Sequence, residues 1–260
     1  MDKQPFNEKK STSNHATDKK NKKKSFGFKK FFLALLTLFI VVFLGVGCGL
    51  VAIGLDGDKD VSDIHPPASS QILDMNGNLI TNIHATENRT LVTLDKIPAN
   101  LQNAFIAVED NRFYEHNGID PRGIFRAIYS NLTSGEVAEG GSTITQQLAK
   151  NAFLSQDRTF KRKIQEFFIA LRLERQYTKE EILEMYLNQI YFGRGAYGVQ
   201  AAAQTYFGKD VSQLDLSECA MLAGIPRSPN YYSPLNNLGA ANERKAEVLD
   251  QMVKYGYIDS

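Results

Sequence analysis

Two segments of this chain carry the residue types that acid–base chemistry on a sugar requires. The first, EDNRFYEHNGID at 109–120, follows an apolar helical run and begins with Glu109. The second, RKIQE at 162–166, sets Arg162 and Lys163 one helical turn before Glu166, 57 positions after the first glutamate. A carboxylate that follows an apolar run is a candidate general base, because partial burial makes a carboxylate more basic.

Between the two glutamates lies GGSTITQQLAKN, 140–151, a Gly-Ser-Thr turn that opens a helix. Ser142-Thr143 is typical of a helix N-cap. Free N–H groups at such a helix start suit a phosphate group when Lys and Arg are nearby. Together, two carboxylates, a basic cluster and this turn indicate sugar chemistry on a phosphorylated donor. Each feature alone also has a structural explanation, namely an ordinary cap and a solvated charged face with i, i+4 pairs.

The elements that must position these groups are mostly helices, because helical periodicity dominates from Pro98 onward. The predicted helices cover 98–110, 122–133, 143–153, 158–176, 179–190, 195–206, 214–223 and 240–255. Before them, residues 69–94 contain short alternating runs around Asp74-Met75-Asn76-Gly77, a strong hairpin signal. We therefore expect a mostly α domain with two or three strands at its start.

Helical spacing also predicts which side chains face the core. The apolar positions of 158–176 predict a buried stripe made of Phe160, Ile164, Phe167, Phe168 and Leu171. Arg158, Arg162 and Glu166 fall at i, i+4 and i+8 on a different face. Around Glu109, a continuing helix would put Arg112, Phe113 and His116 on the same face. A histidine before Asn117-Gly118 is more typical of a helix end than of a catalyst.

The start of the chain differs in composition from the rest. Residues 1–30 hold ten lysines and three acidic residues, 31–55 are uncharged and almost wholly apolar, and 56–67 form a linker. A transmembrane helix needs about 20 apolar residues, so 31–55 is predicted to span a membrane. The basic tail then lies in the cytoplasm and 68–260 forms one outer domain.

Two other readings of the apolar segment fit less well. A cleaved signal peptide has an apolar core of only about 7–15 residues. A lipoprotein signal ending at Gly47-Cys48 would have leucine where Gly45 stands. The two cysteines make no disulfide framework, because Cys48 lies in the predicted span and Cys219 in the outer domain. Neither has the spacing of a metal site, so no metal-ligating residue is predicted.

Five ordered segments resemble the motifs of the family-51 glycosyltransferases, the peptidoglycan glycosyltransferases of class A penicillin-binding proteins and their monofunctional relatives. Besides 109–120 and 140–151, they are 158–174, 179–209 and 216–234, within a resemblance that covers roughly 68–255. Five linked motifs in one order are far more specific than any single motif. The resemblance implies a lysozyme-like, mostly helical fold with a membrane-embedded small jaw. It also implies a lipid II substrate and processive β-1,4 glycan synthesis.

The resemblance carries roles over position by position. It makes Glu109 the base that takes the proton from the acceptor sugar's 4-hydroxyl, and Glu166 the second essential glutamate, near the donor pyrophosphate. The remaining positions would bind substrate or support the site. The basic positions near the pyrophosphate are Lys150, Arg158, Arg162 and Lys163; the polar donor-site residues are Ser142, Gln146 and Gln147; Asp110 is grouped with substrate binding, and Phe113 and His116 with structural support.

Competing functions remain at this point. A lysozyme-like glycan hydrolase also uses two carboxylates, but it does not need the cationic cluster. An inactive wall-binding module would not need intact Glu109 and Glu166. The transpeptidase signatures Ser-x-x-Lys and Lys-Thr-Gly do not occur in the chain, although the ending 243–260 resembles the passage that leads into that second domain.

The resemblance also sets expectations about surroundings. The enzyme is expected at the bacterial cell (inner) membrane, single-pass, with its catalytic domain on the periplasmic or extracellular side. Its partners would be lipid II, the growing glycan strand, the membrane and cell-wall synthesis proteins, with no nucleic acid. No cofactor is required by the sequence, and Mg²⁺ at the pyrophosphate is left open because no dedicated carboxylate cage is evident.

Overall fold

The computed structural model describes residues 70–73, 75, 79–83, 88–134, 140–154 and 159–259, with six isolated helical positions between Leu33 and Gly49. The basic tail, the linker, Arg158 and nearly all of the predicted membrane span lie outside these residues. The chain divides into two units, 1–49 and 50–260, and the description below concerns the second. Within the described part, no helix combines the length and apolar character needed to cross a membrane.

The described strands form two small sheets. β1 (Ser70–Leu73) and β2 (Leu79–Ile83) pair antiparallel, which confirms the predicted hairpin. β3 (Asn88–Arg89) pairs instead in parallel with β4 (Ala196–Tyr197), far along the chain. This pairing ties the start of the domain to the segment between two helices.

The run TLVTL at 90–94, the last alternating run in the stretch predicted to hold two or three strands, does not form a strand. Leu94 begins a 3-10 helix, η1 (Leu94–Lys96). Side chains of a helix, α6 (Lys179–Gln189), take the backbone groups that a strand partner would take. Asn188 Oδ1 accepts from the Val92 amide at 2.9 Å, and Glu184 Oε2 accepts from the Leu94 amide at 2.7 Å.

The remaining helices match the predicted ranges to within four residues at each end. They are α2 (Ala99–Glu109), α3 (Pro121–Ser134), α4 (Ile144–Phe153), α5 (Phe160–Gln176), α7 (Val199–Phe207), α8 (Leu216–Gly224) and α9 (Leu238–Lys254). The largest boundary error is at α7, predicted from 195. It begins only after Gly198, whose φ of +80° and 2.7 Å approach of a Cβ to the Asn188 carbonyl oxygen require glycine.

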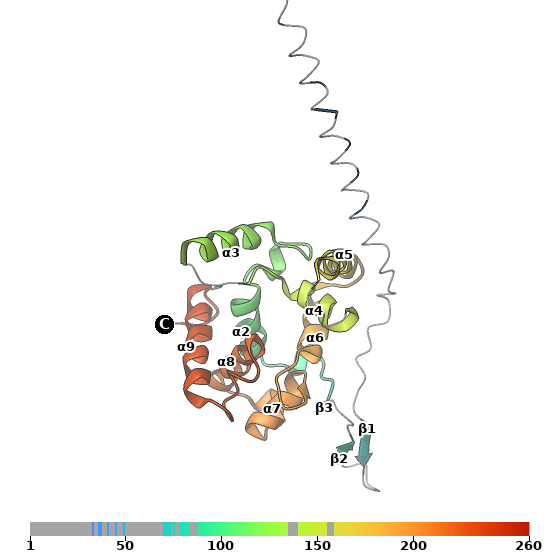
Figure 1. Ribbon diagram of the computed structural model, residues 1–260. Helices are drawn as coiled ribbons and strands as arrows, with labels where there is room; N and C mark the ends of the chain where they lie inside the picture. Colours follow the sequence, from blue (N-terminus) through green and yellow to red (C-terminus); the bar gives the residue numbers. More distant parts are fainter. Residues whose placement is uncertain are drawn as a thin grey trace, which may run out of the picture. The chain divides into compact units, whose positions relative to one another are not determined.

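The helices pack in two groups (Figure 1). α2, α8 and α9 contact one another, and α4 contacts α5 and α6. Phe105 of α2 joins the groups, because its ring meets Tyr186 of α6 edge-on at 6.0 Å and Phe192 edge-on at 6.1 Å. All three rings are fully buried, and truncating such a side chain typically costs about 3–5 kcal/mol. The end of α2 is therefore held firmly between the two groups.

Local capping fixes where the central helices begin. The Thr143 hydroxyl accepts from the Gln146 amide while the Gln146 side chain accepts from the Thr143 amide, a complete capping box at α4. Thr178 and Glu181 form the same arrangement at α6. Each cap contributes about 1 kcal/mol. The predicted cap at Ser142-Thr143 is thus confirmed at Thr143.

The predicted buried stripe of α5 is wrong. The residues that the helix buries are Glu166, Ile169, Ala170 and Leu173. Phe160 and Phe167 are exposed instead. The buried face of α5 therefore differs from the predicted one and includes Glu166, whose charge is compensated by Arg162 and Lys163. The apolar residues Ile169, Ala170 and Leu173 follow on this buried face. A charged residue has displaced aromatic residues from the inner face.

The predicted common face of Glu109, Arg112, Phe113 and His116 is also wrong. α2 ends at Glu109, and Asp110 leaves the helical conformation with φ −158° and ψ 73°. The chain then forms a short 3-10 helix, η2 (Phe113–Glu115). The Asp110 side chain explains the turn, since it accepts hydrogen bonds from outside α2.

Candidate active site

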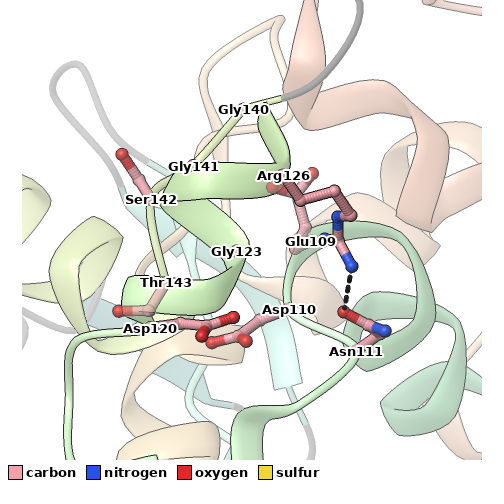
Figure 2. A pocket seen from close by; sticks show the side chains of 10 residues that line it. All are labelled: Glu109, Asp110, Asn111, Asp120, Gly123, Arg126, Gly140, Gly141, Ser142 and Thr143. Carbon is pink, nitrogen blue, oxygen red and sulfur yellow. Dashed lines mark hydrogen bonds between the residues drawn. The ribbon is translucent and has the colours of Figure 1, made fainter. Parts of the chain in front are cut away.

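Glu109 is the last residue of α2 and is only partly buried. Its Oε2 accepts a hydrogen bond from Gln147 Nε2 on α4 at 2.7 Å. The contact fixes one carboxylate oxygen and leaves the other facing the neighbouring cavities. Figure 2 shows Glu109 near Arg126, whose Nη1 donates to Asn111 Oδ1 at 3.5 Å.

Asp110 is buried and holds the turn that follows Glu109. Its carboxylate is bound by His116 Nε2, at 2.9 and 3.0 Å, and accepts from the Ile144 amide at 3.0 Å. Thr143 Oγ1 donates to the Gly118 carbonyl at 2.6 Å. These bonds join the start of α4 to the loop after the candidate base. Asp110 was predicted to bind substrate, and its carboxylate is engaged in this structural network. His116, predicted as structural support, contacts that carboxylate.

Phe113 is fully buried under the same loop. The Lys179 ammonium lies 4.4 Å from its ring centroid and donates to Glu174 Oε1 at 2.7 Å. Thr145 Oγ1 on α4 donates to the same oxygen at 2.6 Å. Through Glu174 and Lys179, these contacts connect the loop, α4 and α5.

The second glutamate, Glu166, is 2 % exposed and lies among basic residues. Lys163 pairs with its Oε1, and Arg162 Nη1 lies 3.4 Å from its Oε2. Lys163 also donates to Ser142 Oγ at 3.0 Å, across from α5 to the turn before α4. Because a single carboxylate faces two cations here, the cluster retains positive charge.

Lys150 connects the two glutamates electrostatically. Burial lowers the pKa of its ammonium, the charges of Arg162 and Lys163 lower it further, and the charges of Glu166 and Glu109 raise it. All four charged neighbours are predicted site residues from α2 and α5. A partly desolvated ammonium beside two other cations gains most from an incoming anion. The site is therefore suited to a group that brings two or more negative charges.

Two cavities adjoin Glu109. The small one, about 20 Å³, has room for a water molecule and extends past Asp120 to Ser142 and Thr143 (Figure 2). The larger one, about 430 Å³, lies toward α9 and is lined by Arg126, Arg227, Arg244, Gln251 and Tyr255 among others. Glu109 lines both, so it lies on the wall between a small polar space and a larger one rich in arginine.

Most of the predicted site residues meet around α4. Gln147 and Lys150 face the two glutamates, and Ser142 contacts Lys163. Gln146 differs, because it is buried and its side-chain oxygen is used by the α4 cap. Arg158 lies outside the described residues.

Sequence reasoning missed the arginines of the larger cavity. Arg244 is the clearest case, because it is 6 % exposed and its Nε has no hydrogen-bond partner in the described part of the chain. Its signal was present in the sequence. Arg244 precedes Val248 and Met252 at spacings of four, and both are fully buried, so a charged residue occupies an apolar face. Such a position predicts a functional or compensated charge.

Comparisons with known proteins found sequence similarity over most of the chain. The transglycosylase family model matches residues 76–253. Penicillin-binding protein 1F of Bacillus subtilis (strain 168) is 47% identical over 236 residues, which are 89% of this chain and 32% of the relative. Penicillin-binding protein 1A of Escherichia coli (strain K12) is 48% identical over 234 residues, 89% of this chain and 27% of the relative. The chain thus spans a third or less of the length of these relatives.

A crystal structure of penicillin-binding protein 1A from Haemophilus influenzae also aligns with the chain. It is 29% identical, and the alignment covers 76% of this chain and 20% of that one, with a TM-score of 0.43.

Proposed function

The chain belongs to the transglycosylase family, the family-51 glycosyltransferases, and from this premise we propose that it polymerises lipid II into β-1,4-linked glycan strands and releases undecaprenyl pyrophosphate. The observation that carries the proposal is that α4 and the turn before it reach both glutamates. Gln147 donates to Glu109 at 2.7 Å, and Ser142 accepts from Lys163, which pairs with Glu166. The charges of both glutamates also act on Lys150. One ammonium within electrostatic reach of two glutamates and two further cations makes a single site for acid–base chemistry next to an anion.

The proposed step is one displacement at the anomeric carbon of the donor. The acceptor's 4-hydroxyl oxygen forms the new bond to that carbon while the bond to the pyrophosphate oxygen breaks. The hydroxyl proton passes to Glu109, and the electron pair of the broken bond leaves with the pyrophosphate. Because the donor is α-linked, one displacement gives the β product. A positioned base contributes about 10²–10⁴-fold to such a step.

The basic cluster would serve the leaving group. Its members are Arg162 and Lys163 of α5, which pair with buried Glu166, and Lys150 of α4, on which the charge of Glu166 also acts. Charge develops on the departing pyrophosphate in the transition state, and fixed cations in a partly dry site stabilise such charge most strongly. Glu166 holds the two α5 cations in place. A hydrolase of neutral glycosidic bonds gains nothing from this cluster, which favours the transferase.

The acceptor would occupy the larger cavity. That cavity reaches Glu109 from the side of α9, so a sugar bound in it can present a hydroxyl to the free carboxylate oxygen. The arginines that line it fit an acceptor that itself carries a pyrophosphate. The acceptor would thus approach Glu109 from the larger cavity toward α9, and the donor from the basic cluster of α4 and α5.

Mg²⁺ would come with the substrate if it takes part. Among the described residues, no group of three or more histidine, cysteine, aspartate or glutamate side chains could hold a metal ion. The described residues therefore offer no side-chain cage for a resident divalent cation.

Incubation of the purified protein with labelled lipid II in detergent tests the proposal. We expect polymeric glycan to form, and finished sacculi to stay intact under the same conditions. Muropeptide release from sacculi without polymer from lipid II would establish the hydrolase. No reaction in either assay would favour the wall-binding module.

The catalytic domain would act at the outer surface of the cell membrane, where its lipid-linked substrate lies. α3 supports this location, because four large side chains on one of its faces are exposed: Phe125, Ile128, Tyr129 and Leu132, at 51–79 %. Their spacing of i, i+3, i+4 and i+7 forms one apolar stripe. An exposed stripe of this kind is typical of a helix that lies in a membrane interface.

Depth-dependent fluorescence tests the contact of α3 with lipid. The chain has no tryptophan, so Phe125→Trp creates a single reporter in a protein of this sequence. In proteoliposomes we expect blue-shifted emission and quenching by lipids that carry a quencher on the acyl chain. Tyr231→Trp, at an exposed tyrosine after α8, is the matched control and should respond as a water-exposed probe. Equal quenching of both reporters would rule out a specific role for α3.

A further inference from the structure

A tyrosine hydroxyl lies beneath the candidate base. Tyr186 of α6 is fully buried, and its ring packs edge-on against Phe105. Phe105 is one turn before Glu109 on α2, so the ring lies under the end of that helix. The tyrosine was not among the residues singled out from the sequence, and its ring alone would be an ordinary part of the core.

The hydroxyl of Tyr186 reaches the base through one intermediate. Tyr186 Oη donates to Gln147 Oε1 at 3.4 Å, and Gln147 Nε2 donates to Glu109 Oε2 at 2.7 Å. The first bond is long for a hydroxyl donor, but catalytic hydrogen bonds often tighten when substrate binds. Because the amide oxygen accepts from the tyrosine, the amide nitrogen must face the carboxylate.

The hydroxyl stays protonated and can donate in this arrangement. Burial raises the pKa of Tyr186 well above its ordinary value, and the charges of Glu109 and Asp110 raise it further. The phenol therefore keeps its proton across the working pH range. A donor below Gln147 favours the orientation in which the amide oxygen faces the tyrosine and the amide nitrogen faces the carboxylate.

We propose that Tyr186 is a positioning residue that orients the carboxylate of Glu109 through the side chain of Gln147. This inference rests on the proposed role of Glu109 as the base. The relay occupies Oε2 with a fixed donor and leaves Oε1 free to take the acceptor's proton. A hydrogen bond donated to Oε2 also stabilises the charged form of the carboxylate.

Tyr186→Phe in the whole 260-residue chain tests the relay. The change keeps the ring and removes only the hydroxyl. We expect the rate of polymerisation at saturating lipid II to fall about three- to tenfold, the usual worth of one hydrogen bond. The acid limb of the pH–rate profile should move to higher pH by about half a pH unit. Gln147→Leu breaks the second bond without touching the core, and should move the same limb in the same direction.

Tyr206→Phe is the matched control. Tyr206 Oη also donates inside the fold, to the Phe192 carbonyl at 2.7 Å, but it has no bond to Gln147. Its loss should leave the acid limb in place even if it lowers the melting temperature. Adding Tyr186→Phe to Gln147→Leu should cost nothing more, because the relay is already broken.

Three results would overturn the relay: an unmoved acid limb in both relay variants, an equal shift in Tyr206→Phe, or additive losses in the double variant. The titration of Glu109 can also be followed without substrate, by the ¹³Cδ signal of glutamate-labelled protein assigned with Glu109→Gln. That titration should move with Tyr186→Phe even if lipid II proves not to be the substrate. A wild-type protein that forms no polymer would therefore remove the proposed function but still leave the relay to be decided by the spectrum.

Discussion

Glu109→Gln is expected to abolish polymerisation, with a loss of about 10²–10⁴-fold, the usual contribution of a general base. The amide has the shape of the carboxylate and can still accept the hydrogen bond from Gln147 Nε2. It cannot take a proton at neutral pH. The chemical step should therefore fail while the fold and much of the substrate binding remain.

Initial rates and melting temperatures measured on the same preparations separate catalysis from folding. Glu115→Gln is the matched control, because Glu115 lies in the same loop and is exposed. Surface changes of this kind usually alter stability by less than about 0.5 kcal/mol. A near-normal rate for Glu109→Gln, or a loss of rate that merely follows unfolding, would remove Glu109 as the base.

Glu166→Gln is expected to lower kcat/KM by about 100-fold, or about 2.7 kcal/mol of transition-state stabilisation. Glu166 is buried and is the carboxylate that Lys163 and Arg162 share. Its loss removes the carboxylate that both α5 cations share and the charge that Glu166 exerts on Lys150. Burial already lowers the pKa of Lys150, and the charge of Glu166 opposes that effect. Without it, Lys150 should lose its proton at lower pH.

The sign of this change gives a specific test. If protonated Lys150 holds the pyrophosphate, the alkaline limb of the pH–rate profile should move to lower pH in Glu166→Gln. Glu174→Gln is the matched control, because Glu174 is also a buried carboxylate on α5 that pairs with a lysine, Lys179. Both changes should destabilise the fold by about 1–3 kcal/mol. Only Glu166→Gln should move the alkaline limb, and a shift in both variants would mean a general loss of stability.

Much of the helical framework could be predicted from the sequence because its signals are local. The cap of α4 at Thr143 and the hairpin of β1 and β2 depend on a few neighbouring residues, and both were found. β3 was not found as it stands, because its partner β4 lies in a loop about 100 residues away. No local pattern encodes a pairing over that distance.

The errors at the candidate site have a common physical cause. Hydrophobic periodicity assumes that the most apolar face of a helix is buried, and α5 buries Glu166 while Phe160 and Phe167 are exposed. Tertiary ion pairs compensate the buried charge, and they cannot be read from one helix. The common face predicted for Glu109, Arg112, Phe113 and His116 was wrong for a similar reason, since the bonds of Asp110 to His116 and Ile144 come from later segments.

Gln147 and Lys150 lie less than one helical turn apart on α4. Gln147 donates to Glu109, and Lys150 interacts electrostatically with Glu166. Their separation along the axis is only about 4.5 Å. Inserting one residue between them would rotate one contact about 100° away from the other. Substitutions along α4 can therefore accumulate over time, whereas changes of its length between these two positions cannot. Lineages descended from this chain should diverge in α4 by replacement and keep this interval constant.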